Sequence, residues 1–126
     1  MGSDSATLVS DVMSTPLETI SRSATVRDAI QKMRSEDING LFVPGSSPGI
    51  ITTTDALDVV AAGDDVDNRT VEDVMTAPVE RVTTDVDMNE AAAMMTTYGI
   101  KHLPVTDDHG DYVGMISSSD LATELA

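Results

Sequence analysis

The sequence predicts a mixed α/β fold of the α+β kind, built from two copies of one small unit, each a three-stranded sheet with two helices. Two repeats within the chain support this. Residues 11–16 (DVMSTP) return as residues 73–78 (DVMTAP), and residues 49–55 (GIITTTD) return as residues 114–120 (GMISSSD). Internal repetition fixes an architecture before any local pattern does, because each copy must fold in the same way.

The repeats also predict how the chain is divided. We expect residues 8–62 to form the first repeat, residues 63–69 a linker and residues 70–126 the second repeat, with residues 1–7 as a flexible N-terminal segment. A unit of about 60 residues buries too little of its surface to be very stable alone. The two copies are therefore expected to share a core.

In the first copy, the order of patterns is strand, helix, strand, hairpin turn, strand and helix. A short strand is expected at residues 18–21, and Thr25 can cap the helix that follows. Strands are expected at residues 40–43 and 49–52, and a last helix at residues 55–62. The first helix has apolar residues at helical spacing, namely Val26, Ala29, Ile30 and Met33.

The second copy repeats this order. A strand is expected at residues 79–83, Asp87 can cap the next helix, and Gly99 suits its C-terminal end. The remaining elements are strands at residues 102–105 and 112–117 and a helix from about Asp120 to the end. In each copy the strand-helix-strand part should be parallel and right-handed, and the hairpin antiparallel.

The charge of the chain excludes two kinds of partner. It has 22 acidic and 7 basic residues, which gives a net charge of −15. Such a field repels nucleic-acid phosphates and anionic lipids, so neither nucleic acid nor membrane is expected as a partner. Adaptation to a salt-rich cytoplasm and divalent-cation binding both remain as explanations. The scattered positions of the acids favour the first and predict a halophilic, cytoplasmic protein.

Nothing in the sequence indicates catalysis. The chain has no cysteine, so it has no disulfide framework and no thiol nucleophile. Two histidines do not make a metal cluster, no serine lies in a strained hydrolase turn, and no glycine-rich loop carries a P-loop lysine. There is no apolar run of membrane-spanning length and no signal-peptide pattern at the start. We therefore expect no catalytic residue, no metal site and no fixed cofactor.

Taken together, these motifs resemble a tandem pair of CBS domains, the arrangement called a Bateman module. The resemblance is carried by Val-x-Asp-Val-Met at residues 9–13 and 71–75, by residues 99–105 (GIKHLPV) and by residues 114–120. It covers residues 8–126. Each motif alone is weak, but their order and duplication are specific.

The second copy is the fuller match. In the first copy Gly40 and Phe42 stand where the second has His102 and Pro104, and the hairpin is shortened to residues 44–48 (PGSSP). Any site that depends on this part of the first copy is therefore expected to differ from its counterpart.

The resemblance implies a regulatory role. CBS pairs pack with pseudo-two-fold symmetry and bind adenosine-containing ligands such as AMP, ADP, ATP or S-adenosylmethionine in clefts between the two repeats. They commonly form flat homodimers, and most are attached to an enzyme or transporter that they regulate. The resemblance therefore implies an adenosine nucleotide as ligand, a homodimer and a regulated protein partner.

The resemblance also implies which residues bind. The tail of each copy comprises Ser117, Ser119 and Asp120, or Thr52, Thr54 and Asp55. In similar proteins the hydroxyl and carboxylate here hold the ribose and the first phosphate, since a carboxylate accepts strong hydrogen bonds from ribose hydroxyls. The N–H groups at a helix start attract phosphate. The same Ser-x-x-Asp pattern is also an ordinary helix cap, and both roles can hold together.

Basic residues at the start of the second strand are also implied in binding. Lys101 and His102 occupy positions that approach ligand phosphates in the family, although a surface charge and a packing residue would look the same. The first copy has Asn39 and Gly40 there, so the phosphate affinity of the two sites is expected to be unequal.

In the family each site is composite. One would join Ile38, Asn39 and Gly40 to the tail of the second copy, with Lys101 or His102 at the phosphates. The other would join Ile100, Lys101 and His102 to the tail of the first copy. We expect the site at Asp120 to be the stronger.

Three functions remain open from the sequence. The first is a stand-alone sensor of adenosine-containing nucleotides. The second is a ligand-free dimeric scaffold that docks on a partner, which the shortened first hairpin and the capping alternative favour. The third is a divalent-cation sensor that uses the acidic surface. An enzyme ranks last.

Overall fold

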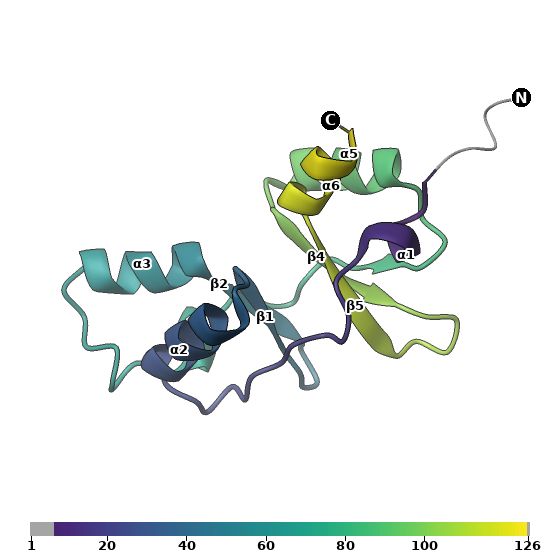
Figure 1. Cartoon of the computed structure of the whole chain (residues 1–126). Helices are drawn as coiled ribbons and strands as arrows, with labels where there is room; N and C mark the ends of the chain where they lie inside the picture. Colours follow the sequence, from purple (N-terminus) through teal and green to yellow (C-terminus); the bar gives the residue numbers. More distant parts are fainter. Residues whose placement is uncertain (1–6, 126) are drawn as a thin grey trace, which may run out of the picture. The chain divides into compact units, whose positions relative to one another are not determined.

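The computed structural model describes residues 7–125, so the segment expected to be flexible, residues 1–7, lies outside the described residues except for Thr7. The chain forms two compact units (Figure 1). The C-terminal unit comprises Met1–Leu17 and Glu80–Ala126, and the central unit comprises Glu18–Val79. These units do not coincide with the sequence repeats, because each contains the opening segment of the other repeat.

The central unit is built around a two-stranded antiparallel sheet. Strands β1 and β2 pair with Leu41 opposite Ile51 and Phe42 opposite Ile50. Its elements in chain order are α2 (Val26–Glu36), β1 (Gly40–Val43), β2 (Gly49–Thr52), α3 (Thr53–Ala61) and α4 (Val71–Val74). Both strands lie where the sequence predicts them.

The strand predicted at residues 18–21 is reduced to a single parallel bridge, between Thr19 and Phe42. The backbone N–H of Phe42 donates to Glu18 O at 3.0 Å, and the N–H of Ile20 donates to Phe42 O at 2.9 Å. The chain then turns, with Ala24 N–H donating to Ser21 O, so the ladder cannot extend. The prediction of a three-stranded sheet is therefore wrong for this unit.

Helix α2 begins where its sequence indicates. The Thr25 side chain accepts a hydrogen bond from the N–H of Asp28, which satisfies one of the free donors at the helix start. The helix ends at Asp37, which has a left-handed backbone with φ of 56°. The core beneath it consists of buried aliphatic residues, namely Ala29, Met33, Leu41, Val43, Ile51 and Val71.

The C-terminal unit contains the three-stranded sheet that the sequence predicts, in the order β3-β4-β5. Val82 in β3 pairs in parallel with Val105 in β4, and β4 pairs antiparallel with β5. The elements are α1 (Val9–Val12), β3 (Val82–Thr83), α5 (Met88–Tyr98), β4 (His102–Thr106), β5 (Tyr112–Ser117) and α6 (Ser118–Leu125). Strand β3 is shorter than predicted, and β4 is one residue longer.

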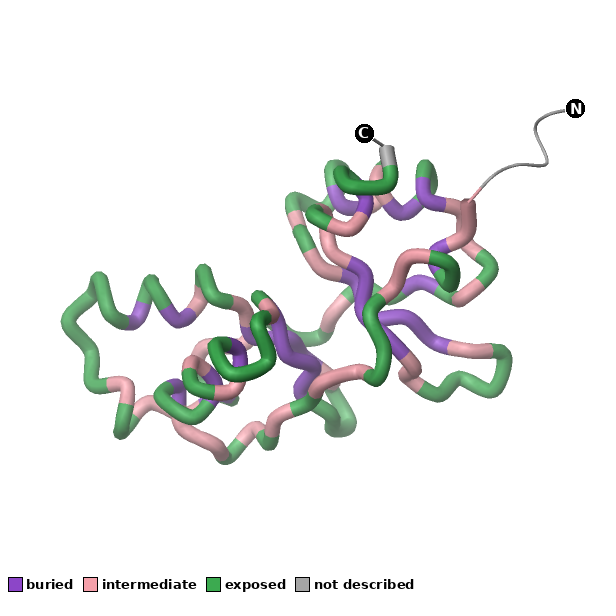
Figure 2. Tube along the Cα trace, in the orientation of Figure 1, coloured by how far each residue is buried: buried purple, intermediate pink, exposed green. Residues whose placement is uncertain are grey.

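Helix α5 confirms two further predictions. The Asp87 side chain accepts from the N–H of Glu90 at 2.9 Å, and Gly99 ends the helix with φ of 66°. Figure 2 shows buried positions along the strands and on one side of each long helix. The core of this unit is formed by Val9, Val82, Met88, Ala91, Met95, Leu103, Val105, Ile116 and Leu121.

The exchanged opening segments lie directly across the last strand of each unit. A Cβ placed on Gly114 in β5 would lie 2.7 Å from Met13 Sδ and 2.9 Å from the carbonyl oxygen of the residue after it. A Cβ on Gly49 in β2 would lie 2.8 Å from Met75 Sδ and 2.8 Å from the next carbonyl oxygen. Only glycine permits this approach, so each Val-x-Asp-Val-Met segment completes the unit of the other repeat.

Candidate functional site

The tail of the second repeat forms a reciprocal cap at the start of α6. The N–H of Ser117 donates to Asp120 Oδ2 at 2.9 Å, and the N–H of Asp120 donates to Ser117 Oγ at 3.1 Å. Both side chains are half-buried, and Ser119 is exposed. The helix begins at Ser118, two residues before the predicted start, because Ser117 is the cap and Asp120 the third residue inside.

The tail of the first repeat has the same arrangement at α3. The N–H of Thr52 donates to Asp55 Oδ2 at 2.8 Å, and the N–H of Asp55 donates to Thr52 Oγ1 at 3.3 Å. In addition, the Thr52 hydroxyl donates to Asp55 Oδ2 at 3.0 Å. Thr54 is exposed. The two tails are therefore closely similar in local geometry.

The capping role that the sequence left open is thus present in both tails. Each of these contacts to the carboxylates of Asp55 and Asp120 uses Oδ2. A carboxylate has two oxygens and about four lone-pair positions, so capping leaves capacity to accept further hydrogen bonds. Capping and ligand binding are therefore compatible at these positions.

The C-terminal unit places the basic pair beside its own tail. His102 in β4 is the register partner of Ser117 in β5, and the N–H of Ser118 donates to Lys101 O at 2.9 Å. Lys101 is exposed and His102 is half-buried. The residue before them, Ile100, is half-buried, and its N–H donates to the last turn of α5.

The central unit brings the corresponding residues together, without the positive charge. Gly40 is the register partner of Thr52, and the N–H of Thr53 donates to Asn39 O at 3.0 Å. The Thr53 hydroxyl also lies 3.3 Å from Asn39 Oδ1. Ile38 is half-buried, and its N–H donates to the last turn of α2. The joining of one repeat's tail to the other repeat's strand start stays a prediction.

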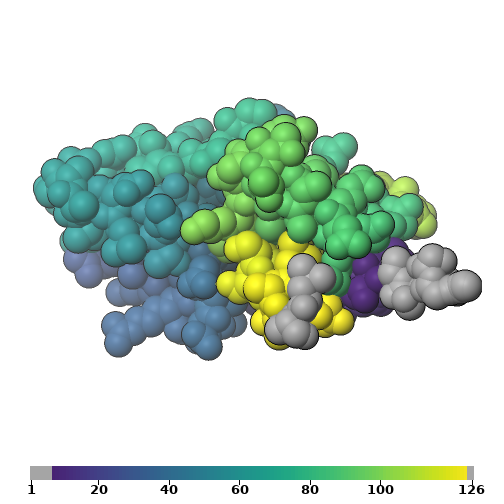
Figure 3. Space-filling view, turned by 90° about the horizontal axis from the view of Figure 1, so that it is seen from above, coloured from purple at the N-terminus to yellow at the C-terminus, as the bar shows by residue number. Residues whose placement is uncertain are grey.

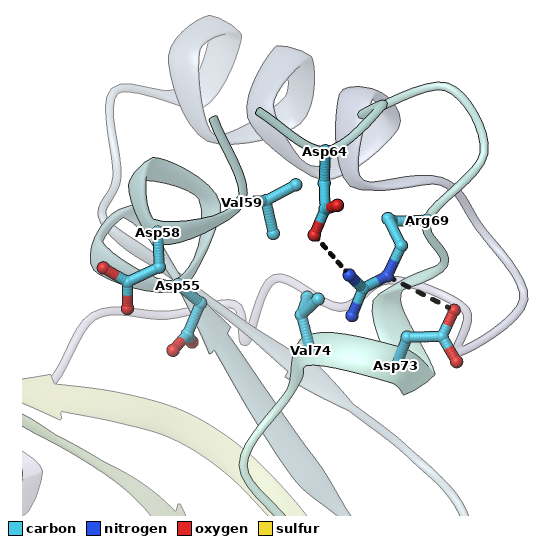
Figure 4. Close-up of a pocket in the computed structure, with 7 residues that line it drawn as sticks. All are labelled: Asp55, Asp58, Val59, Asp64, Arg69, Asp73 and Val74. Carbon is cyan, nitrogen blue, oxygen red and sulfur yellow. Dashed lines mark hydrogen bonds and ion pairs between the residues drawn. The ribbon is translucent and has the colours of Figure 1, made fainter. Parts of the chain in front are cut away.

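A hollow of about 290 Å³ lies beside Asp55 in the central unit (Figure 4). Its walls come from α3, the linker and α4. The lining residues are Asp55, Asp58, Val59, Asp64, Arg69, Asp73 and Val74. The sequence analysis did not predict this hollow, because α4 reaches it only through the exchange of opening segments.

Arg69 provides the positive charge within this hollow. Its Nη1 lies 2.7 Å from Asp64 Oδ2, and its Nε lies 3.9 Å from Asp73 Oδ2. The pKa of Asp73 is lowered, first by hydrogen bonds from the backbone and side chain of Thr70 and then by the charge of Arg69. Four carboxylates and one guanidinium line the hollow, so it is negatively charged at neutral pH. Two of the carboxylates, Asp64 and Asp73, contact Arg69, and Asp55 and Asp58 lie on the α3 side (Figure 4).

Within residues 7–125, no group of three or more histidine, aspartate or glutamate side chains is placed to hold a metal ion. No described helix is both long enough and apolar enough to cross a bilayer.

Comparison with known families identifies the fold. The CBS domain model matches residues 9–62 and 71–126, so the chain belongs to the CBS domain family, as a tandem pair. A 17.7 kDa protein of uncharacterised function from Acidianus ambivalens is 30% identical over 121 residues, which is 95% of this chain and 74% of that protein.

Solved structures of CBS proteins have the same fold. The CBS domain pair of protein MJ0100, solved in complex with 5′-methylthioadenosine and S-adenosyl-L-methionine, is 28% identical with a TM-score of 0.85. The match covers 95% of this chain and 96% of that one. A hexameric CBS-CP12 protein from bloom-forming cyanobacteria is also 28% identical, with a TM-score of 0.89 over 94% of this chain and 72% of that one.

Relatives with enzyme names are much longer than this chain. The inosine-5′-monophosphate dehydrogenase of Nitrosopumilus maritimus is 31% identical over 102 residues, 81% of this chain but only 21% of the enzyme. The L-aspartate semialdehyde sulfurtransferase of Methanocaldococcus jannaschii is 30% identical over 92% of this chain and 23% of its own length. The chain therefore corresponds to the CBS pair of such multidomain proteins, which is typically a regulatory module.

Proposed function

We propose that this CBS pair is a non-catalytic regulatory sensor that binds an adenosine-containing ligand, AMP, ADP, ATP or S-adenosylmethionine, through its tails. The proposal includes the expectations from the sequence that it works in a salt-rich cytoplasm, as a homodimer that acts on a regulated protein partner. Support comes from the family and from the related MJ0100 pair, which was solved with two adenosine-containing molecules.

The observation that carries the proposal is the duplicated tail at a helix start. Asp120 and Asp55 are each held in place by the backbone N–H of the capping residue, so the carboxylate is already oriented. Such a carboxylate can accept hydrogen bonds from both hydroxyls of a ribose. The partial positive charge of the helix N-terminus favours a phosphate or carboxylate nearby.

Phosphorylated ligands should bind first at the Asp120 tail. Lys101 lies beside that tail, because its carbonyl oxygen accepts a hydrogen bond from the N–H of Ser118. Asn39 lies at the same place beside the Asp55 tail. The hollow beside Asp55 adds further negative charge. Because like charges repel most strongly where solvent is partly excluded, a phosphate is expected to bind more weakly near Asp55.

The test is a thermal-stability series in concentrated potassium chloride with each of the four ligands, with and without magnesium. A ligand that binds only the folded state raises the melting temperature in a saturable way. Asp120→Ala should remove most of that rise. Asp87→Ala is the matched control, because Asp87 also caps a helix but lies outside both tails. It should lower the basal melting temperature while leaving the ligand-induced rise intact.

Two outcomes would contradict the proposal. One is a flat response to every adenosine ligand at millimolar concentration, which would favour the ligand-free scaffold. The other is an equal loss of the rise in Asp120→Ala and Asp87→Ala, which would reduce the tail to a helix cap.

A further inference from the structure

The sulfur of Met75 lies beside both strand β2 and the guanidinium of Arg22. A Cβ on Gly49 in β2 would be 2.8 Å from Met75 Sδ, so the sulfur rests directly against this strand. Arg22 Nη2 lies 4.0 Å from the same sulfur. A thioether is only a weak acceptor, so the contact as it stands contributes little hydrogen bonding.

The guanidinium of Arg22 has donor capacity that it does not use. Its Nη2 donates to Ser47 O at 2.9 Å and carries a second N–H, and its Nη1 lies 3.6 Å from Glu72 Oε2. Its Nε is buried and has no hydrogen-bond partner within residues 7–125. A buried donor without a partner costs free energy, and such a group calls for an explanation. A strong acceptor beside this guanidinium would therefore be stabilised.

Solvent can reach the neighbourhood of Met75. The residue is half-buried, and Glu72, Asp73 and Thr76 around it are exposed. In Figure 3 the chain around α4 (residues 70–76, teal-green) lies at the surface of the central unit. The other methionine of this unit, Met33, is 4% exposed and belongs to the core. A small oxidant must touch the sulfur to react with it, so it should reach Met75 first.

We propose that Met75 is a site of reversible oxidation by hydrogen peroxide, and that Arg22 binds the resulting sulfoxide. The sulfur attacks one peroxide oxygen, so that an S–O bond forms and the O–O bond breaks. The proton of the transferred oxygen passes to the leaving oxygen, which departs as water. The sulfur is oxidised by two electrons and the peroxide is reduced. The new oxygen is a strong acceptor beside an ionised donor, so a charge-assisted hydrogen bond replaces the weak sulfur contact.

Met13 occupies the matching place in the C-terminal unit but has a different neighbour. Its sulfur would be 2.7 Å from a Cβ on Gly114, and it is also half-buried. Thr84 stands at the position that matches Arg22, and a threonine carries no positive charge. A sulfoxide at Met13 therefore puts a polar oxygen into an apolar contact without an arginine at that place to bind it. Oxidation should leave α4 in place and loosen α1.

Hydrogen exchange of the partly oxidised full-length chain tests this difference. After treatment with hydrogen peroxide, mass spectrometry of the digested chain separates peptides that carry a sulfoxide from those that do not, because they differ by one oxygen. The N–H groups of Met75 and Thr76 report on α4, and those of Met13 and Ser14 report on α1. All four donate to backbone carbonyl oxygens of their own unit, so their exchange measures local opening.

In the unmodified chain, the Met75 peptide should exchange within about twofold of the same rate whether or not it is oxidised, whereas oxidation of Met13 should speed exchange of its peptide by at least about tenfold. In Arg22→Gln, oxidation of Met75 should also speed exchange by at least about tenfold, because glutamine has no charge to hold the oxygen. Arg27→Gln is the matched control, since Arg27 forms an exposed ion pair with Asp67. It should behave as the unmodified chain.

Each contrary result overturns the inference. If Met75 stays reduced at peroxide concentrations that oxidise Met13 in the folded chain, its sulfur is not accessible. If oxidation speeds exchange equally at Met75 and Met13 in the unmodified chain, Arg22 does not hold the sulfoxide, and this comparison needs no variant to fold. If Arg22→Gln and Arg27→Gln give the same ratio, another group binds the oxygen. No adenosine ligand is present in the experiment, so this proposal and the proposed function can fail separately.

Discussion

The two units present nearly the same tail but hold it by different means. In the C-terminal unit the hairpin before the tail closes on itself, since Asp107 Oδ1 accepts from the N–H of His109 at 2.9 Å and of Asp111 at 3.0 Å. In the central unit the shortened hairpin is held from outside. There Arg22 Nη2 donates to Ser47 O at 2.9 Å.

The same arginine reaches α4. Arg22 Nη1 lies 3.6 Å from Glu72 Oε2, and the guanidinium carbon lies 3.1 Å from where a Cβ on Gly45 would be. The positions that match Arg22 and Glu72 in the other unit are Thr84 and Ser10, and the N–H of Ser10 donates to Thr84 O at 3.3 Å, as the N–H of Glu72 donates to Arg22 O at 3.0 Å. We call the contacts of Arg22 with Ser47 and Glu72 the clasp. The comparison shows that long-range contacts can replace the hydrogen bonds within a turn without altering the tail that follows.

The largest expected effect tests a feature that both units share. Gly114→Ala and Gly49→Ala should each destabilise the fold by about 2–3 kcal/mol, because a backbone carbonyl that cannot move aside meets the new methyl group. Urea unfolding measures this. Adding Met13→Ala to Gly114→Ala should recover only part of the loss, since the carbonyl oxygen at 2.9 Å remains. Full recovery would show that the Met13 side chain alone causes the destabilisation in Gly114→Ala.

The clasp gives the next largest effect and applies to one unit. Arg22→Gln should destabilise the central unit by about 1–2 kcal/mol, since it removes a charge-assisted hydrogen bond from a side chain that is only 29% exposed. Hydrogen exchange should show faster exchange in β1 and β2. Arg27→Gln is the control, because its ion pair with Asp67 is more than half exposed and worth little. Equal effects from both variants would remove the distinction between the units.

The C-terminal ends of α2 and α5 allow one substitution that should stabilise the protein and one that should destabilise it. Asp37 and Gly99 end α2 and α5 with left-handed backbones, but only glycine adopts this conformation without strain. An aspartate there also places negative charge at the negative end of the helix dipole. Asp37→Gly should therefore stabilise the protein by about 0.5–1 kcal/mol, and Gly99→Asp should destabilise it similarly. Thermal unfolding of the two variants checks this. A loss of stability in Asp37→Gly would contradict it and would show that the Asp37 carboxylate makes a stabilising contact.

The smallest effect concerns pH. The pKa of Asp73 is lowered in the folded chain, so its charged form is favoured there. The stability it provides is present above its unfolded pKa and is lost as pH falls through the lower folded pKa. The free energy of unfolding, measured between about pH 5 and pH 2, should depend slightly less on pH in Asp73→Asn than in the unmodified chain. An unchanged pH dependence in Asp73→Asn would contradict a contribution from this carboxylate.

Much of the secondary structure could be predicted because it depends on local chemistry. Thr25 and Asp87 cap helices as their side chains indicate, and β1, β2 and β5 follow the expected ranges. The tails are placed at helix starts for the same reason. The strand predicted at residues 18–21 is only one bridge long, because a hydrophobic pattern does not indicate how many residues will pair with the neighbouring strand.

What could not be predicted depends on contacts distant in sequence. The clasp joins Arg22 to Ser47 across 25 positions, and no short motif records it. The hollow forms only once α4 packs in the central unit beside α3. The candidate residues were found through the family resemblance, while their local pairing required the strand register.

Because the opening segments are exchanged, each folded unit depends on residues from both repeats. Val9 and Val71 are both fully buried, and each fills the core of the unit formed mainly by the other repeat. Removing one sequence repeat would therefore leave a strand uncovered and a core unfilled in what remains. Deleting either repeat is therefore expected to destabilise both folded units.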